Sequence, residues 1–363
     1  MAWEVDFLAV GEGEKSGDAI ALRFGNLTGR RDEQTVMVID GGTQDSGERL
    51  VAHIRKYYGT NRIDTAISTH PDMDHASGLS VVLESMEVAR LLMHQPWNHA
   101  RAISDMFTDG RVTATGLEER VWRALQGARD LEKIAARKNI PIIEPFTDNF
   151  RDVLSPSREF YQGQLARFRC MPSQSGRQAD ARLLEALLSP IKIAARALES
   201  WFRETLVDPD SELVSGENNS SVVLLLDLGN EKFLFTGDAG VPALEQAAAR
   251  AAALGIDLKT VRYLQIPHHG SRRNVGPTIL NTIIGPILPE TAPKTKFAFI
   301  SAGKGGAPKH PAKKVTNAFL RRGVNVYVTE GHSIRQPKDA PARPEYSTSA
   351  SCVPFFTGED DTD

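Results

Sequence analysis

Apolar and polar positions along the chain form two blocks of short, strand-like segments, separated by a block with helical periodicity. In the first block, turns that contain Gly and Asn divide the apolar runs, a pattern that predicts an antiparallel meander of three strands. An amphipathic helix, a buried strand and a second helix are predicted to follow. In order, the segments are 3–10, 18–24 and 35–39 for the meander, 48–58 for the helix, 64–68 for the strand and 79–86 for the start of the second helix.

The middle of the chain, residues 95–215, lacks this strand rhythm and predicts a helical insertion. Long Ala-, Leu- and Arg-rich helical patterns cover 117–138 and 179–206. Strand signals return over 216–336, beginning with a hairpin across Gly229-Asn230. The expected strands there are 221–228, 232–236, 261–266, 296–301 and 324–328, and the expected helices are 241–254, 277–284 and 312–322. Residues 337–363 turn Pro-rich and then acidic, which predicts a loosely ordered tail.

Composition narrows the class of protein. The chain has 363 residues, of which 41% are hydrophobic and 25% charged, and this ordinary globular composition argues against disorder and against a fibre. It contains neither an apolar run of about 18 residues, which a membrane span requires, nor a secretory signal pattern at its start. Cys170 and Cys352 lie far apart, which excludes a cysteine-based zinc site or a disulfide framework. We therefore expect a cytoplasmic protein with no membrane partner.

Charge is unevenly distributed along the chain. Residues 259–322 carry twelve basic side chains against one acidic side chain, Glu290, a balance of +11, so the remainder of this −3 chain carries −14. Such an asymmetry favours an anionic partner for the basic segment. The alternative is an ordinary solvated surface.

One short stretch carries the strongest chemical signal. His70, Asp72, Asp74 and His75 all offer metal ligands within six residues, directly after a predicted buried strand. Alternate residues of an extended loop point the same way, so the first three can converge while His75 turns in from the next position. Clustered carboxylates repel one another, and a bound cation removes that cost. The stretch therefore predicts a metal site, with a solvated Asp-rich turn as the alternative.

Two further clusters follow predicted apolar strands. Asp238 comes after Gly237 at the end of one strand, and His268-His269-Gly270-Ser271 follows another. Taken singly, Asp238 is equally typical of a helix cap, and the histidines of a protein surface. Loops at strand ends are where functional sites are built on rigid scaffolds, so the three clusters together predict one shared site.

On these motifs the chain resembles the metallo-β-lactamase fold superfamily. The family's HxHxDH signature appears as residues 70–75, with Asp72 in place of the second histidine; its bridging aspartate matches Asp238, and its last metal histidine falls in the His268-His269 pair. Within the superfamily, the chain is most similar to the hydrolase domain of ComEC-type bacterial DNA-uptake proteins. The segments that carry this similarity are 7–11, 17–20, 39–42, 70–75, 218–223, 237–238, 268–271, 309–311 and 329–334.

The resemblance implies an α/β fold, a four-layer αββα sandwich. Residues 1–94 and 216–336 would form its two halves, with 95–215 as a helical insertion or cap and 337–363 as the tail. It also implies two divalent metal ions, Zn²⁺ or Mn²⁺. His70 and Asp72 would serve one ion; Asp74, His75 and one of His268 and His269 the other; Asp238 would bridge the two, and Asp40 would orient a ligand. The usual third-motif histidine is missing, and Asn218 and Asn219 stand at its place, so one ion would be held weakly.

These roles suggest a bacterial metal-dependent hydrolase. Two metal ions would activate a hydroxide for attack on a phosphodiester, with nucleic acid, and DNA first, as the substrate. Asp74, His269 and Ser271 are the candidate catalytic residues, and the candidate phosphate-binding residues are Arg272, Arg273, Lys304 and Lys309. The same fold also supports hydrolysis of a small ester, lactone or thioester, and a non-catalytic metal-binding regulatory protein is a third possibility. The insertion is a candidate surface for a protein partner or a dimer.

Overall fold

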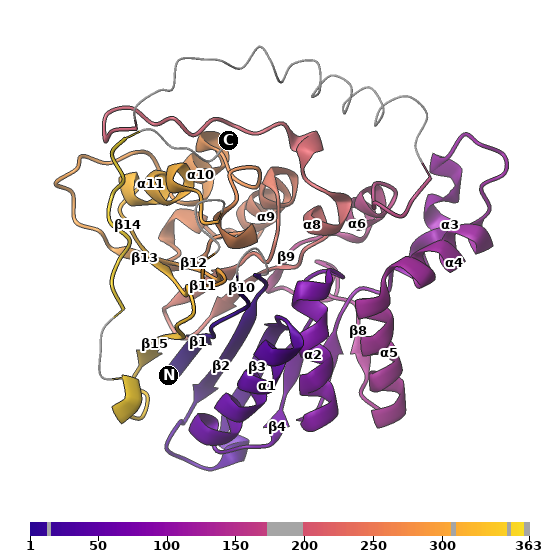
Figure 1. Cartoon of the computed structure of the whole chain (residues 1–363), viewed down its shortest axis with the longest axis horizontal. Helices are drawn as coiled ribbons and strands as arrows, with labels where there is room; N and C mark the ends of the chain where they lie inside the picture. Colours follow the sequence, from indigo (N-terminus) through magenta and orange to yellow (C-terminus); the bar gives the residue numbers. More distant parts are fainter. Residues whose placement is uncertain (13–15, 173–198, 306–309, 347–349, 359–363) are drawn as a thin grey trace.

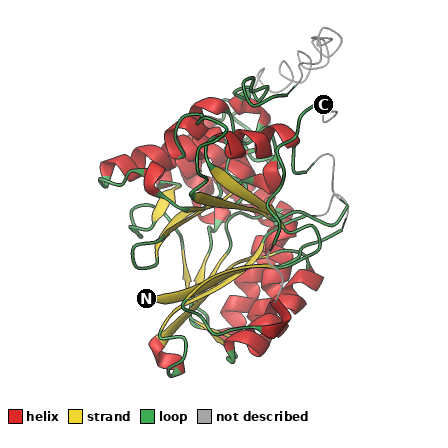
Figure 2. Cartoon of the chain, turned by 90° about the vertical axis from the view of Figure 1, so that its left-hand side faces the viewer, coloured by secondary structure: helices red, strands yellow, loops and turns green. Residues whose placement is uncertain are grey.

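A computed structural model describes residues 1–12, 16–172, 199–305, 310–346 and 350–358 of the chain. Two β-sheets lie face to face, and helices cover their outer faces (Figures 1 and 2). This confirms the predicted αββα arrangement. Within the described residues, no helix is long and apolar enough to cross a membrane.

The first sheet has seven strands in the order β15-β1-β2-β3-β5-β7-β8. The predicted meander is confirmed, because β1, β2 and β3 pair antiparallel in sequence order. β5, β7 and β8 then add in parallel beyond β3. The strand bounds are β1 (Ala2–Phe7), β2 (Ala19–Gly25), β3 (Gln34–Gly41), β5 (Thr65–Ile67), β7 (Leu91–Leu92), β8 (Ile142–Ile143) and β15 (Ile334–Lys338).

The second sheet has six strands in the order β14-β13-β12-β11-β10-β9. β10 and β11 form the predicted antiparallel hairpin, and β12, β13 and β14 continue in parallel from β11. The strand bounds are β9 (Val153–Ser155), β10 (Val223–Asp227), β11 (Lys232–Phe235), β12 (Tyr263–Gln265), β13 (Lys296–Ile300) and β14 (Val324–Val328). A separate two-stranded ribbon pairs β4 (Arg62–Ile63) with β6 (Glu87–Val88).

Helices pack on the outside of each sheet. The main helices beside the first sheet are α1 (Gln44–His53), which continues as a π-helical turn over Ile54–Tyr58, α2 (Met73–Ser85) and α5 (Gln126–Lys138). Those on the second sheet are α9 (Val241–Ala253), α10 (Pro277–Ile283) and α11 (Lys313–Arg321). The other α-helices of the described residues are α3 (Ala100–Ile103), α4 (Ala114–Ala124), α6 (Arg158–Leu165) and α8 (Gly216–Asn219).

Strand residues alternate between two cores because successive side chains point to opposite faces of a sheet. In β3, Val36 and Val38 belong to the core under the helices, whereas Met37 and Ile39 face the second sheet. The core between the sheets is rich in aromatic side chains. Phe233 stacks on Tyr263 with ring centroids 4.4 Å apart, for example. Both faces of each sheet are therefore apolar, as a four-layer sandwich requires.

The predicted insertion differs from the structure. The helix predicted over 117–138 is divided at Leu125 into α4 and α5. β8 and β9 also lie inside 95–215, where they form one edge of the first and of the second sheet. Part of this stretch therefore belongs to the sandwich itself. Strands of two or three residues are too short to produce a recognisable alternation, which is why the sequence pattern missed them. Most of the helix predicted over 179–206 lies outside the described residues.

The tail also differs from its prediction. β15 extends past residue 336 and pairs with β1, and the following turn buries Arg343. The Arg343 guanidinium lies 2.8 Å from Oδ1 of Asp6 and 2.9 Å from Oε2 of Glu4. These two acidic residues lie on β1, more than 300 positions away, so no local pattern in the sequence indicated that the tail is anchored.

Candidate metal centre

The predicted metal-binding side chains come together where strands of both sheets end. Asp40 is the penultimate residue of β3, and His70 follows β5. Asp238 follows β11, while His268 and His269 follow β12. Because β3 runs parallel to β5, and β11 parallel to β12, these chain segments follow the carboxyl ends of neighbouring strands and lie at the same end of each sheet. The tertiary structure thus joins the three sequence clusters into one site.

Asp74 and His75 lie in the first turn of a helix, not in an extended loop as predicted. α2 begins at Met73, although Gly78 suggested a later start. A Cβ atom at residue 78 would lie 2.0 Å from the carbonyl oxygen of Gly41. Gly78 therefore allows α2 to pack directly against the end of β3, and it does not mark the start of the helix.

Three imidazole rings surround the carboxylate of Asp238. Nε2 of His75 lies 3.5 Å from Oδ1, while Nε2 of His70 and Nε2 of His268 lie 3.7 Å and 3.6 Å from Oδ2. These separations are longer than normal hydrogen bonds. Among the described residues, Oδ1 of Asp238 and Nε2 of His70 and His75 are buried without a hydrogen-bond partner. The group is therefore close-packed and polar, yet unsatisfied.

His269 extends the group toward Asp74. Nε2 of His269, also buried without a hydrogen-bond partner in the described part of the chain, lies 4.0 Å from Oδ2 of Asp74. The side chain of Asp74 is 42% exposed, whereas that of Asp238 is 4% exposed. Asp74 is thus the carboxylate of this pair that meets solvent.

The other nitrogen of each ring, Nδ1, has a defined partner. The partners are Oγ1 of Thr69 for His70 at 3.0 Å, Oδ2 of Asp40 for His75 at 2.9 Å, Oδ1 of Asn274 for His268 at 2.8 Å, and the carbonyl oxygen of Ser301 for His269 at 2.8 Å. A carboxylate and a carbonyl can only accept, so His75 and His269 donate from Nδ1. Their Nε2 atoms are then left with a lone pair.

The same tautomer follows for His70, and the shorter of two contacts favours it for His268. The hydroxyl of Thr69 donates to Oδ2 of Asp40 at 2.6 Å, so its oxygen accepts from Nδ1 of His70. The side-chain amide of Asn274 donates to the carbonyl of Asp238 at 2.9 Å, which turns its oxygen toward Nδ1 of His268. In their neutral form, His70, His75 and His269 thus direct a lone pair on Nε2 into the site, which is the state that binds metal.

Charge at the site also favours a cation. Burial alone would raise the pKa of Asp238, but His268, His75 and His269 hold the pKa of that carboxyl well below its usual range. Burial alone would lower the pKa of His75, yet Asp238 and the neighbouring carboxylates raise it well above its ordinary value. Three overlapping groups of the described residues have ligand atoms within 4.8 Å of one another: Asp40, His70 and His75; Asp74, His75 and His269; and Asp18, His75 and Asp238. These orphaned, mixed imidazole and carboxylate atoms fit a divalent metal ion.

Asp72 is not part of any of these groups, although it belongs to the same motif. Its carboxylate is held by Arg169, at 2.7 Å from Nη2 to Oδ1 and 2.9 Å to Oδ2. Of the two asparagines, Asn218 lies beside the site, with Nδ2 3.3 Å from Nδ1 of His268. Asn219 is fully buried against Val214, and no contact joins it to the histidines within the described residues.

The candidate catalytic and phosphate-binding residues have varied positions. Ser271 is buried two residues after His269, and its hydroxyl accepts the backbone N–H of Arg273 at 3.3 Å. Arg272 is partly buried and Arg273 is exposed at the same turn. Lys304 is exposed and forms an isolated backbone bridge with Glu12. The remaining candidate, at position 309, lies outside the described residues.

Asp18 is a site residue to which the sequence interpretation assigned no role. Its Oδ2 lies 3.8 Å from Nδ1 of His75 and accepts the side-chain amide of Gln265 at 2.8 Å. Burial raises the pKa of this carboxyl. Gly17 before it has a φ of +116°, and a Cβ there would lie 1.9 Å from the backbone oxygen of Asp74. The Gly17-Asp18 pair was the signal that the sequence offered. A glycine allows another backbone segment to approach closely, and here an acidic residue follows it.

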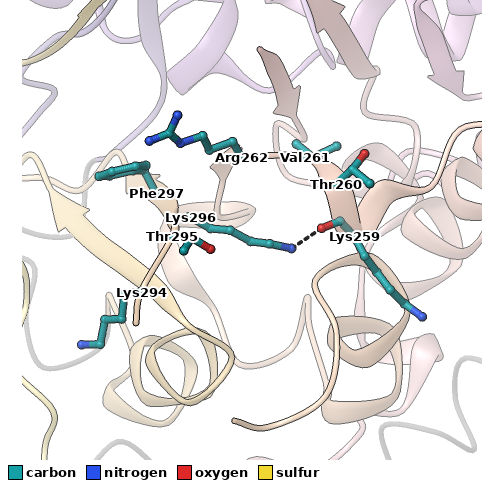
Figure 3. Close-up of a pocket in the computed structure, with 8 residues that line it drawn as sticks. All are labelled: Lys259, Thr260, Val261, Arg262, Lys294, Thr295, Lys296 and Phe297. Atoms are coloured by element: carbon teal, nitrogen blue, oxygen red, sulfur yellow. Dashed lines mark hydrogen bonds between the residues drawn. The ribbon is translucent and has the colours of Figure 1, made fainter. Parts of the chain in front are cut away.

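The basic segment does not form one surface at this site. Lys259, Arg262, Lys294 and Lys296 line a separate pocket of about 530 Å³ at the amino ends of β12 and β13 (Figure 3). His268 lies beyond the carboxyl end of β12, so the pocket and the metal centre are at opposite ends of this strand. Further along, the guanidinium groups of Arg321 and Arg322 are buried in ion pairs with Glu199 and Glu204. Among the described basic residues of the +11 segment, Arg272 and Arg273 closely follow the histidine pair in the chain and carry the predicted link to the chemistry.

The chain is similar to a protein family, to a curated relative and to solved structures. Residues 29–281 match the family model of the metallo-beta-lactamase superfamily. ComE operon protein 3 of Bacillus subtilis (strain 168) is 28% identical over 125 residues, which are 34% of this chain and 14% of that protein, so the match spans about one seventh of the relative. Two solved structures are similar at 11% identity. The match to a long-form RNase Z from yeast has a TM-score of 0.39 and covers 92% of this chain and 41% of that chain. The match to a diphosphatase from the PhnP family has a TM-score of 0.32 and covers 93% of this chain and 99% of that chain.

Proposed function

Because this chain belongs to the metallo-β-lactamase superfamily, we propose that it is a metal-dependent phosphodiesterase that cleaves nucleic acid, with DNA as the first candidate substrate. The observation that carries the metal-dependent part is the shared tautomer of three histidines, His70, His75 and His269. Each donates from Nδ1 to a fixed partner and directs Nε2 inward. Neutral rings held in this way are typical metal ligands with their orienting partners.

Within this proposal, two sets of residues hold the metal. Asp74, His75 and His269 form the first set, and His70 and His268 form the second. The carboxylate of Asp238 lies between the two sets. A divalent cation bound there supplies Lewis acidity, which lowers the pKa of water and stabilises negative charge on an attacked phosphoryl group. The metal identity, Zn²⁺ or Mn²⁺, is an outcome of the experiment below.

Residues of the chain itself position the water and the substrate. Asp74 reaches solvent, and although burial would raise the pKa of its carboxyl, His75 and His269 contribute to holding it below the usual value. It therefore stays ionised at neutral pH and can accept a proton from an attacking water. The hydroxyl proton of Ser271 is not needed for its contact with the N–H of Arg273, so it can be donated to a phosphate oxygen.

Cationic side chains at the rim support a phosphodiester over an uncharged ester. Arg273 is exposed two residues after the buried hydroxyl of Ser271, and Arg169 lies beside Asp72 with 65% of its side chain exposed. Cations next to a metal centre favour an anionic backbone and make affinity depend on salt.

The test is a cleavage assay with the purified chain. The protein is stripped with a chelator, reloaded with Mn²⁺ or Zn²⁺, and offered single- and double-stranded DNA and RNA, together with ester, lactone and thioester substrates. Asp238→Asn is compared with Asp227→Asn, an identical change at an exposed residue near the end of β10. We expect metal-dependent nucleic-acid cleavage that only Asp238→Asn abolishes.

The other outcomes decide between the alternatives. Turnover of the small esters with no cleavage of nucleic acid would overturn the phosphodiesterase proposal in favour of a small-substrate hydrolase. Metal binding with no turnover of any substrate would identify a non-catalytic metal-binding protein.

A further inference from the structure

Arg169 connects the metal-binding motif to a part of the chain nearly 100 residues away. Its Nη2 atom donates to both carboxylate oxygens of Asp72, at 2.7 Å and 2.9 Å. Asp72 precedes α2 directly, two residues before Asp74. Hydrogen bonds between a guanidinium and a carboxylate are among the stronger ones because both partners are charged. The negative charge that Asp72 would offer to a metal ion is therefore already paired with a guanidinium.

Glu217 fixes the position of Arg169 from the other side. Its Oε1 atom accepts the backbone N–H of Arg169 at 2.8 Å and lies 3.2 Å from Nε of the same residue. The side chain of Glu217 is 2% exposed, so removal of its cationic partner would leave a buried carboxylate unpaired. Glu217 lies in α8, which also carries Asn218 at the edge of the metal centre. The guanidinium thus lies between two carboxylates at the rim of the site.

A divalent cation and this guanidinium cannot share Asp72 equally. Both are positive and repel each other, so each weakens the binding of the other to this carboxylate. In the described part of the chain, Asp72 is absent from every group whose ligand atoms lie within 4.8 Å, whereas Asp74 is present. The guanidinium is nevertheless able to move, because 65% of the Arg169 side chain and 23% of the Asp72 side chain are exposed. An ion pair that reaches solvent on one side is weaker than a fully buried one, so another ion can compete with it.

We propose that Arg169 competes with a divalent metal ion for Asp72. One ion then binds tightly at Asp74, His75, Asp238 and His269, and a second binds weakly at His70 and Asp72 until the guanidinium is drawn to another anion. A phosphodiester is such an anion, so the second ion and the substrate bind cooperatively. This inference rests on the metal-binding part of the proposed function, but it requires no hydrolysis.

Metal titration without turnover tests the competition. Mn²⁺ is titrated into the metal-free chain and followed by isothermal calorimetry and electron paramagnetic resonance. For the unaltered protein we expect one tight ion and a second that binds at least about tenfold more weakly. Arg169→Gln should tighten the second ion about tenfold. Arg167→Gln is the matched control, because Arg167 lies on the same segment but pairs with Glu212, and it should bind both ions like the unaltered protein.

A second pair of variants separates competition from a simple change in charge. Asp72→Asn and the double variant with Arg169→Gln should both bind the second ion weakly, because the ligand itself is gone. An equal tightening by Arg169→Gln in the presence and absence of Asp72 would overturn the proposal, as would unchanged binding in Arg169→Gln. Arg169→Ala is made in parallel, and thermal unfolding identifies any variant that fails to fold.

Diethyl phosphate, a diester anion, tests the cooperative step. It should tighten the second ion in the unaltered protein and have no such effect in Arg169→Gln; an equal effect in both would contradict the proposed displacement. If the unaltered protein binds no Mn²⁺ or Zn²⁺ at all, the metal-dependent function itself fails. If it binds two ions and cleaves nucleic acid but Arg169→Gln changes nothing, only the present inference fails.

Discussion

Oδ2 of Asp40 lies 2.9 Å from Nδ1 of His75, and both side chains are completely buried. The same carboxylate accepts the backbone N–H and the hydroxyl of Thr69, at 2.8 Å and 2.6 Å. One acidic residue therefore fixes the orientation of His75 directly and that of His70 through Thr69. This connection makes Asp40 the residue that aligns both rings with Asp238.

Asp40→Asn tests this alignment with little change in shape. Asp40 has a φ of +55°, which asparagine also tolerates, so the fold should be retained. An amide can present N–H to Nδ1 of His75 and reverse its tautomer, and we expect metal affinity to fall about 10–100-fold. Calorimetric titration with Mn²⁺ measures the effect, and Asp227→Asn is the control. Metal affinity equal to that of the unaltered protein would show that Asp40 does not orient the ligands.

Metal removal should lower thermal stability. Oδ1 of Asp238 and Nε2 of His75 are buried without hydrogen-bond partners in the described structure, so a cation that satisfies them binds the folded state alone. At a free metal concentration of 100 times Kd, the expected stabilisation is about 2.7 kcal/mol. Differential scanning calorimetry with and without a chelator measures it. Asp238→Asn should lose most of this metal-dependent shift, and an undiminished shift in that variant would place the ion elsewhere.

Arg343 should be critical for stability although it lies far outside the metal centre. It is buried between Glu4 and Asp6, and Arg343→Met would leave both carboxylates short of a partner. Breaking a buried ion pair from one side typically costs about 3–5 kcal/mol. Urea unfolding measures the loss. Lys56→Met, which removes an exposed pair with Glu345, is the comparison and should have little effect. Similar midpoints for the two variants would contradict a structural role for the tail.

The same cluster predicts a limit to acid stability. Burial would raise the pKa of Asp6, but His53 and Arg343 together hold it below the ordinary value of 3.8. The stability from this carboxylate is therefore complete above the ordinary pKa and is lost as pH falls through the lower, folded-state value. Asp6→Asn should remove this contribution at neutral pH. Urea unfolding at several pH values should show the two proteins converge below about pH 4; a constant difference down to acidic pH would argue against the assignment.

Nucleic-acid binding measurements should show at which end of the strands in the second sheet phosphates bind. Arg273 lies beside the metal centre, whereas Lys259 and Lys294 line the pocket at the opposite end of the strands (Figure 3). If phosphates bind at the metal centre, Arg273→Ala should reduce the slope of log affinity against log salt by about one. Lys259→Ala should leave the slope unchanged. The reverse result, measured by fluorescence anisotropy with labelled DNA, would move the binding surface to the pocket.

Short-range patterns in the sequence predicted much of the fold. The meander, the β10–β11 hairpin and the helices α9, α10 and α11 were predicted within a few residues of their bounds, because alternation and helical periodicity extend over enough positions to be recognised. The four-layer sandwich and its superfamily followed from the motifs and are confirmed. The candidate ligands His70, Asp74 and His75 were found because they crowd into one short segment, and Asp238 and His269 because strand-end clusters accompanied them.

Long-range packing decided the rest. Alone, the residue types of the motif gave Asp72 and Asp74 equal standing, since both are carboxylates near histidines. Only the tertiary structure separates them, by placing Arg169 on one and His269 near the other. Likewise, the charges of residues 259–322 could be counted from the sequence. Which of them lie at either end of the strands of the second sheet, and which are buried in ion pairs, depends on strand direction and on distant partners. The sequence by itself determined which chemical groups the site contains, because they lie in local motifs. The fold decided which of them face one another, because charge and hydrogen-bond partners come from segments far apart in the chain.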